Sequence, residues 1–135
     1  MDNIKKQAWF KYYLPSYLYA GLIFTLSSYS LVVPPSLPSF SDKWIHFVEY
    51  TIFGLLLARS YLNAKTNFLK QYFIIVAFLT GSICAFFDEY YQSFVPLRGF
   101  ETLDLLADML GILSGVMIYK AAKYLSKGTV TGTKP

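Results

Sequence analysis

Long apolar runs separated by short polar segments constrain this chain more than any other feature. No charged residue occurs between Lys11 and Asp42, or between Lys70 and Asp88. A helix of about 20 apolar residues is long enough to cross the roughly 30 Å hydrocarbon core of a bilayer. The chain is 55% hydrophobic, with a mean hydropathy of +0.40, unlike an ordinary soluble domain. We therefore expect an all-α integral membrane protein, a bundle of four transmembrane helices, with a soluble helical bundle as the alternative.

The runs predict where these helices begin and end. The expected helices span about residues 12–33, 44–61, 68–87 and 102–124. A proline- and serine-rich loop, 34–41, follows the first, and Ser41 or Asp42 can cap the second. The second and fourth helices are weak by hydropathy because acids interrupt them. We divide the chain into a cytoplasmic N-terminus, a four-helix transmembrane domain and a disordered cytoplasmic tail, at residues 1–11, 12–124 and 125–135.

The charges are distributed unevenly between the two sides of such a bundle. Of the 12 basic residues, only Lys43 and Arg98 fall on the side away from the termini, whereas every acid except Asp2 falls there. Basic residues concentrate on the cytoplasmic side of membrane proteins. We therefore predict a multi-pass protein with both termini cytoplasmic and an acidic cluster that faces outward.

Ionisable and amide side chains gather at that outer side, where the apolar runs end. At 100° per residue, His46 and Glu49 share one face of the second helix, and Asp104 and Asp108 share a narrow face of the fourth. Ionisable groups in a membrane are costly and mark a functional site by default. We predict an outward-facing polar cavity built by the second, third and fourth helices. Its candidate ligand-binding residues are Lys43, His46, Glu49, Tyr50, Asp88, Glu89, Gln92, Arg98, Asp104 and Asp108. The nearby aromatic residues form either its walls or an interfacial belt: Tyr50, Phe53, Tyr90 and Tyr91.

The residue types in this cluster leave several kinds of chemistry open. Arg98 is the natural counter-charge, either in a functional role or as a clamp that ties the loop to Asp104. General acid–base catalysis would use His46 as acid and Glu89 or Asp104 as base. No cofactor is assigned, but a divalent cation stays open, and the oxygen-rich ligand set suits hard cations better than zinc. Its candidate ligands are His46, Glu49, Asp88, Glu89, Asp104 and Asp108.

Other features have simpler interpretations. Gly111 and Gly115 form a small-xxx-small pair that lets another helix backbone approach closely, so we assign them to helix packing. Cys84 lies inside an apolar run and excludes an intrachain disulfide, because it is the only cysteine. The lysines form no basic stripe, which argues against nucleic-acid binding.

Three motifs resemble those of the VanZ-like membrane proteins. They are D-K-x-x-H-x-x-x-Y from Asp42, D-E-x-x-Q-x-F-V-P-x-R from Asp88, and D-x-x-x-x-x-x-G-x-x-x-G from Asp104. The family's signature positions carried over are Asp42, Lys43, His46, Tyr50, Asp88, Glu89, Gln92, Pro96, Arg98, Asp104 and Gly111. The chain departs from the family at Leu97, often glycine, and at Asp108, often asparagine. The resemblance implies a small polytopic protein of the bacterial inner membrane, from a family in which some members are associated with lowered teicoplanin sensitivity.

Taken together, these features favour a binding protein of the cell envelope over an enzyme. The expected ligand is a membrane lipid, a lipid-linked envelope precursor or a glycopeptide such as teicoplanin, with Arg98 and Lys43 attracting its anionic group. Two alternatives stay open: an intramembrane acid–base or metal-assisted enzyme acting on a lipid-linked substrate, and a structural subunit whose polar cluster fixes helix packing. A homo-oligomer is compatible with each of them.

Overall fold

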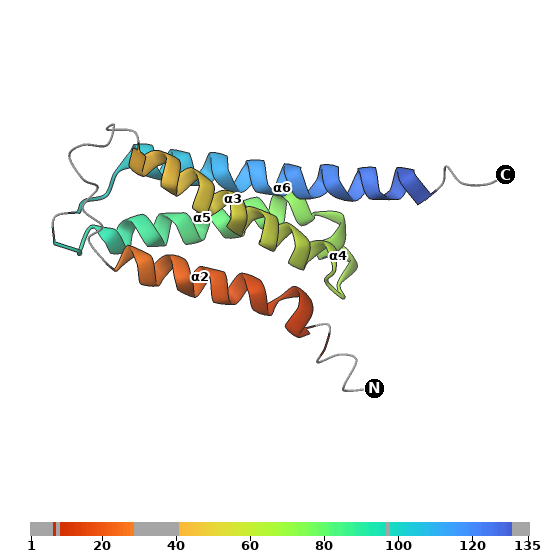
Figure 1. The fold of residues 1–135 in the computed structure, drawn as a ribbon. Coiled ribbons are helices and arrows are strands. Elements are labelled where there is room, and N and C mark those ends of the chain that lie inside the picture. The colour runs from red at the N-terminus through yellow and green to blue at the C-terminus, as the bar shows by residue number, and fades with distance from the viewer. Residues whose placement is uncertain (1–6, 8, 29–40, 97, 131–135) are drawn as a thin grey trace.

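The computed structural model describes residues 7, 9–28, 41–96 and 98–130, with side chains through residue 126, and these residues form helices and no strand (Figure 1). The helices are α2 (Leu14–Ser27), α3 (Ser41–Leu62), α4 (Asn67–Gln71), α5 (Phe73–Gln92) and α6 (Thr102–Val130). The start of α2 and the end of α6 lie at the same end of the molecule (Figure 1). The all-α prediction is therefore confirmed for the described residues.

The helix boundaries differ from the prediction in three places. Helix α3 begins at Ser41, so Asp42 lies within its first turn instead of at the cap, and its carboxylate accepts the backbone N–H of Lys43 at 2.9 Å. The third apolar run is divided at Tyr72 into the short α4 and the longer α5. Helix α6 continues to Val130, past the expected end near Tyr124, which shortens the predicted tail. Of the predicted loop 34–41, residues 34–40 lie outside the described residues, as does the expected end of the first helix at Val33.

Helices α3 and α6 form the most extensive helix pair, and glycines allow their close approach. A Cβ atom on Gly111 would meet the backbone carbonyl of Phe47, and one on Gly115 would meet that of Thr51. Gly54 plays the reciprocal part on α3, where a Cβ would meet the backbone of α6. Small residues at a helix–helix interface allow such backbone contacts. The register between α3 and α6 is thus fixed by three glycines.

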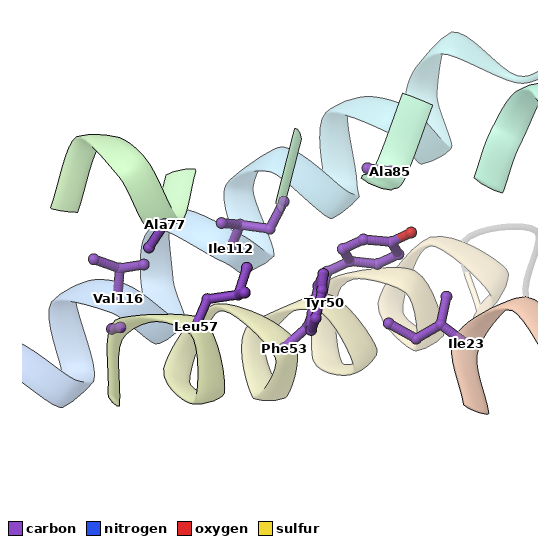
Figure 2. Packing of buried hydrophobic residues seen from close by; sticks show 9 residues of the cluster. Ile23, Tyr50, Phe53, Leu57, Ala77, Ala85, Ile112 and Val116 are labelled. Atoms are coloured by element: carbon purple, nitrogen blue, oxygen red, sulfur yellow. The ribbon is translucent and has the colours of Figure 1, made fainter. Parts of the chain in front are cut away.

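The apolar core lies between α3, α5 and α6, and α2 closes one side (Figure 2). Tyr50 and Phe53 of α3 pack there with Ile112 of α6 and Ile23 of α2, each at most 2% exposed. Ala77 and Ala85 of α5 are fully buried, so α5 also packs at short range. The core therefore holds the four longer helices around a narrow centre.

Large apolar side chains also cover the outer faces of these helices. They include Leu18 and Leu22 of α2, Ile45, Val48 and Ile52 of α3, Ile75, Leu79 and Ile83 of α5, and Leu106, Leu110 and Leu113 of α6. Two helical segments of the described residues are long and apolar enough to cross a membrane, Phe73–Gln92 and Thr102–Ser126, and in each only 28% of an apolar stretch of 18 residues is buried in the protein. The fourth run, which we expected to be weak by hydropathy, thus passes this test, while α3 does not.

Candidate functional site

The predicted polar residues meet at the end of the bundle where α5 is joined to α6. Six of their side chains belong to residues that are at most 5% exposed: His46, Asp88, Glu89, Gln92, Asp104 and Asp108. They come from α3, α5 and α6, and helical periodicity predicted the inward position of His46 on α3 and of Asp104 and Asp108 on α6. The structure therefore brings together residues that lie more than 60 positions apart in the chain.

His46 and two acids form the innermost part of this cluster. The Nδ1 atom of His46 lies 3.0 Å from Oδ1 of Asp108 and 3.9 Å from Oε1 of Glu89. The second oxygen of Glu89 accepts the backbone N–H of Glu101 at 3.1 Å, which ties the loop before α6 to α5. A hydrogen bond of this kind fixes the orientation of the Glu89 carboxylate. His46, Glu89 and Asp108 thus form a buried triad with one preferred geometry.

Gln92 holds the neighbouring carboxylate, that of Asp88. Its side-chain amide donates to Oδ2 of Asp88 at 2.9 Å and lies 3.3 Å from the hydroxyl oxygen of Ser27 on α2. Ser27 was not among the predicted site residues. The only signal for it in the sequence is a serine in an apolar run, which is too common to single it out. The contact joins α2 to the polar end of α5.

Lys43, and not Arg98, is the counter-charge of Asp104. The ammonium of Lys43 lies 2.6 Å from Oδ1 of Asp104, 2.8 Å from Glu101 and 3.1 Å from Asp42. The clamp between Arg98 and Asp104, one of the two roles considered for Arg98, is therefore not formed within the described residues. Lys43 reaches Asp104 because the glycine contacts set the α3–α6 register, and that register was not predictable from either helix alone.

Besides the Ser82 hydroxyl of α5, four buried polar atoms have no hydrogen-bond partner within the described residues. They are the Tyr50 hydroxyl, Oδ1 of Asp88, Oε1 of Glu89 and Oδ2 of Asp108, and they belong to residues that are at most 1% exposed. A buried acceptor without a donor costs about 1–3 kcal/mol, and more when it is charged. Carboxylate oxygens therefore outnumber the available donors at this end of the bundle.

A cavity of about 530 Å³ lies beside the cluster, between α2 and α3. Its polar lining residues are Tyr19, Ser27, His46, Glu49, Gln92 and Arg98. Its apolar lining comes from Leu26, Trp44, Ile45, Val48 and Ile52. The location differs from the prediction, because no residue of α6 lines this cavity. The acids of α5 and α6 lie behind His46, packed in the interior.

The predicted aromatic walls also differ. Tyr50 and Phe53 belong to the buried core, and Tyr90 and Tyr91 are 53% and 43% exposed on the surface. None of the four lines the cavity, where Tyr19 and Trp44 supply the aromatic surface instead. Both were inconspicuous in the sequence because aromatic residues are frequent throughout it. Leu97, one of the two departures from the family pattern, lies outside the described residues.

These observations define a helical protein with an apolar exterior and an acidic cluster buried between its helices. The chain belongs to the VanZ/LLP1 family, whose family model matches residues 4–123, and this confirms the resemblance in the motifs. No curated protein and no solved structure matches the chain. The family and the two apolar helices together indicate a membrane protein.

Proposed function

We propose that this protein spans the bacterial inner membrane through α2, α3, α5 and α6, with both termini in the cytoplasm. The exposed apolar faces of all four helices support this, because they would be costly in water. The excess of lysine and arginine on the side of the termini gives the orientation. The polar end of the bundle then faces outward, in the outer leaflet or at its surface.

The function that the geometry supports best is the binding of an anionic lipid-linked ligand of the cell envelope. The observation that carries this proposal is the cavity between α2 and α3, which has apolar walls and a polar group of His46, Glu49, Gln92 and Arg98. Ligand sites are usually built in this way, from apolar surface with a few convergent polar groups. An acyl or prenyl chain fits against the α3 wall, and the headgroup fits at the polar end.

Arg98 is the residue best suited to hold the headgroup. It lines the cavity, and no ion pair within the described residues engages its guanidinium. Lys43, the other cation at this end, is already engaged by three acids. A guanidinium binds phosphate through two parallel hydrogen bonds, which favours a phosphate or pyrophosphate headgroup. Glu49 and Gln92 can bind amide or hydroxyl groups of an attached sugar or peptide.

Binding of the lipid-linked peptidoglycan precursor would also affect glycopeptide sensitivity, since it would compete for a shared cell-wall ligand. We therefore include teicoplanin itself among the ligands to be tested. A protein that modulates teicoplanin sensitivity through this cavity should lose that effect when Arg98 is changed. The same change should leave the membrane level of the protein unaltered.

The test is ligand binding by purified protein in detergent, followed by native mass spectrometry with a polyprenyl phosphate, the lipid-linked peptidoglycan precursor, phosphatidylglycerol and teicoplanin. Loss of a charge-assisted hydrogen bond costs about 1.5–3 kcal/mol, so Arg98→Ala should weaken binding by about 10- to 150-fold. Arg59→Ala is the matched control, since Arg59 lies in the last turn of α3 and not in the cavity. Unchanged affinity of folded Arg98→Ala for all four ligands would refute the proposal.

A second candidate function is acid–base catalysis on such a ligand, and the triad favours it. His46 lines the cavity and pairs with buried Asp108, which is the arrangement that a general acid or base needs. Asp104 is poorly suited as the base because Lys43 engages it at 2.6 Å, and neither Asp104 nor Glu89 lines the cavity, so His46 is the group of this set that would contact the ligand. Loss of lipid turnover in His46→Gln with retained binding would support catalysis. Binding without turnover in the wild type would exclude it for that ligand, and neither binding nor turnover would leave a structural role for the cluster.

A further inference from the structure

We propose that His46, Glu89 and Asp108 form a divalent-cation site where α3, α5 and α6 meet. One ligand atom from each residue lies within 4.8 Å of the other two, which is close enough for a single ion to contact all three. The three residues are 4%, 0% and 0% exposed, so the site is interior. It shares His46 with the cavity lining, whereas Glu89 and Asp108 lie outside that lining.

The buried oxygens without partners point to a cation. Oε1 of Glu89 and Oδ2 of Asp108 accept no hydrogen bond within the described residues, although both side chains are fully buried. The Tyr50 hydroxyl is also buried and has no hydrogen-bond partner among the described residues. Each oxygen would lose its hydration without compensation if nothing replaced the water. A divalent ion bound at the triad would contact the carboxylates of Glu89 and Asp108 and offset their negative charge.

A second group of three acids, next to the triad, shows how the fold can compensate clustered carboxylates with a lysine. Asp42, Glu101 and Asp104 also place three oxygens within 4.8 Å of one another, but the ammonium of Lys43 contacts all three. Within the described residues, no lysine or arginine forms an ion pair with Glu89 or Asp108, whose only such partner is His46. The ammonium of Lys43 therefore compensates the outer group of acids. The interior pair, Glu89 and Asp108, has instead a histidine that can serve as a metal ligand.

The surrounding structure would hold the ligands in place. Gly111 follows Asp108 by one turn and contacts the backbone of Phe47, the residue after His46, so this contact sets the spacing of the two ligands. The Glu101 backbone N–H fixes Glu89 from the other side. Such outer contacts raise metal affinity by orienting the ligands. One imidazole and two carboxylates suit Mn²⁺, and they also accept Zn²⁺.

The first test uses the wild-type full chain alone, purified in detergent without a polyhistidine tag and treated with a chelator. Mn²⁺ is then titrated and followed by electron paramagnetic resonance, with a pulsed measurement for directly coordinated nitrogen. His46 is the only histidine in the chain, so an imidazole nitrogen signal can come from no other residue. The proposal predicts one saturable Mn²⁺ per chain with one coordinated nitrogen. The absence of saturable binding of both Mn²⁺ and Zn²⁺ would overturn it.

The second test assigns the carboxylate ligands. We expect Glu89→Gln and Asp108→Asn each to weaken Mn²⁺ binding by about tenfold or more. Glu49→Gln is the comparison variant, because Glu49 lies on the same helix as His46 but outside the triad, and it should weaken Mn²⁺ binding far less than either triad substitution. Displacement of the bound Mn²⁺ by Zn²⁺ would support a site that accepts both ions. Mn²⁺ binding that shows no nitrogen and survives both triad substitutions would overturn it, and would place the ion at Asp42, Glu101 and Asp104.

Discussion

Replacement of Lys43 by methionine gives the sharpest test of the packing at the polar end. The side chain of Asp104 is 7% exposed and that of Lys43 is 17% exposed, so their 2.6 Å contact is largely shielded from water. Removing one partner of a buried pair costs about 3–5 kcal/mol, because the other charge is left without compensation. Because Lys43 keeps some exposure to water, the cost is lower here, and we expect Lys43→Met to reduce the free energy of unfolding by about 2–4 kcal/mol. Methionine keeps most of the apolar volume of the lysine stem.

The partner acids should differ in their coupling to Lys43. Glu101 is 56% exposed, and an exposed pair contributes about 0.2–1 kcal/mol. A double-mutant cycle in detergent should therefore show strong coupling of Lys43→Met with Asp104→Asn and weak coupling with Glu101→Gln. Lys70→Met, at an exposed position, serves as the control and should cost less than about 0.5 kcal/mol. Equal costs for the Lys43 and Lys70 substitutions, or equal coupling to both acids, would refute the reasoning.

Three further predictions concern packing, the amide at the site, and orientation. Gly115→Ala should lower the free energy of unfolding by about 1–3 kcal/mol, because its Cβ would meet the backbone of α3. Gly21→Ala should be neutral or stabilising, since a Cβ there would meet no packing neighbour among the described residues within 4 Å. Gln92→Leu should cost about 1–3 kcal/mol in the same unfolding assay by removing the donor to a buried carboxylate, and an unchanged stability would contradict that contact. With the native cysteine replaced by alanine, an impermeant maleimide should label Phe94→Cys but not Ser126→Cys in intact cells. The opposite pattern would reverse the proposed topology.

Helical periodicity predicted the interior faces well, because each face depends only on spacing within one helix. Asp104, Asp108, Gly111 and Gly115 share a buried face of α6 as expected. His46 is likewise buried on the inner face of α3. The pattern could therefore say which side chains point inward, although it could not say which of them touch.

Contacts between helices were beyond the sequence, since they depend on register and on loops. Lys43 rather than Arg98 reaches Asp104, and that choice follows from the depth at which the glycines of α6 meet α3. Gly54 was not singled out, although it packs against α6 from the other side. The cavity was predicted between the second, third and fourth helices, but it lies between α2 and α3. The hydropathy of a helix does not indicate which neighbour it packs against, so the position of α2 relative to α3 could not be predicted.

The central claim is that the cavity between α2 and α3 holds a lipid-linked ligand with its headgroup at Arg98, and photo-crosslinking tests it most directly. A polyprenyl phosphate with a diazirine on its chain would be irradiated with the protein, and the labelled residues located by peptide mass spectrometry. The account predicts labels on α3 at Ile45, Val48 or Ile52, competed by unlabelled ligand and reduced by Arg98→Ala. Labelling that instead falls on the cavity of about 620 Å³ beside Lys120 at the other end of the bundle, or that resists competition, would contradict it.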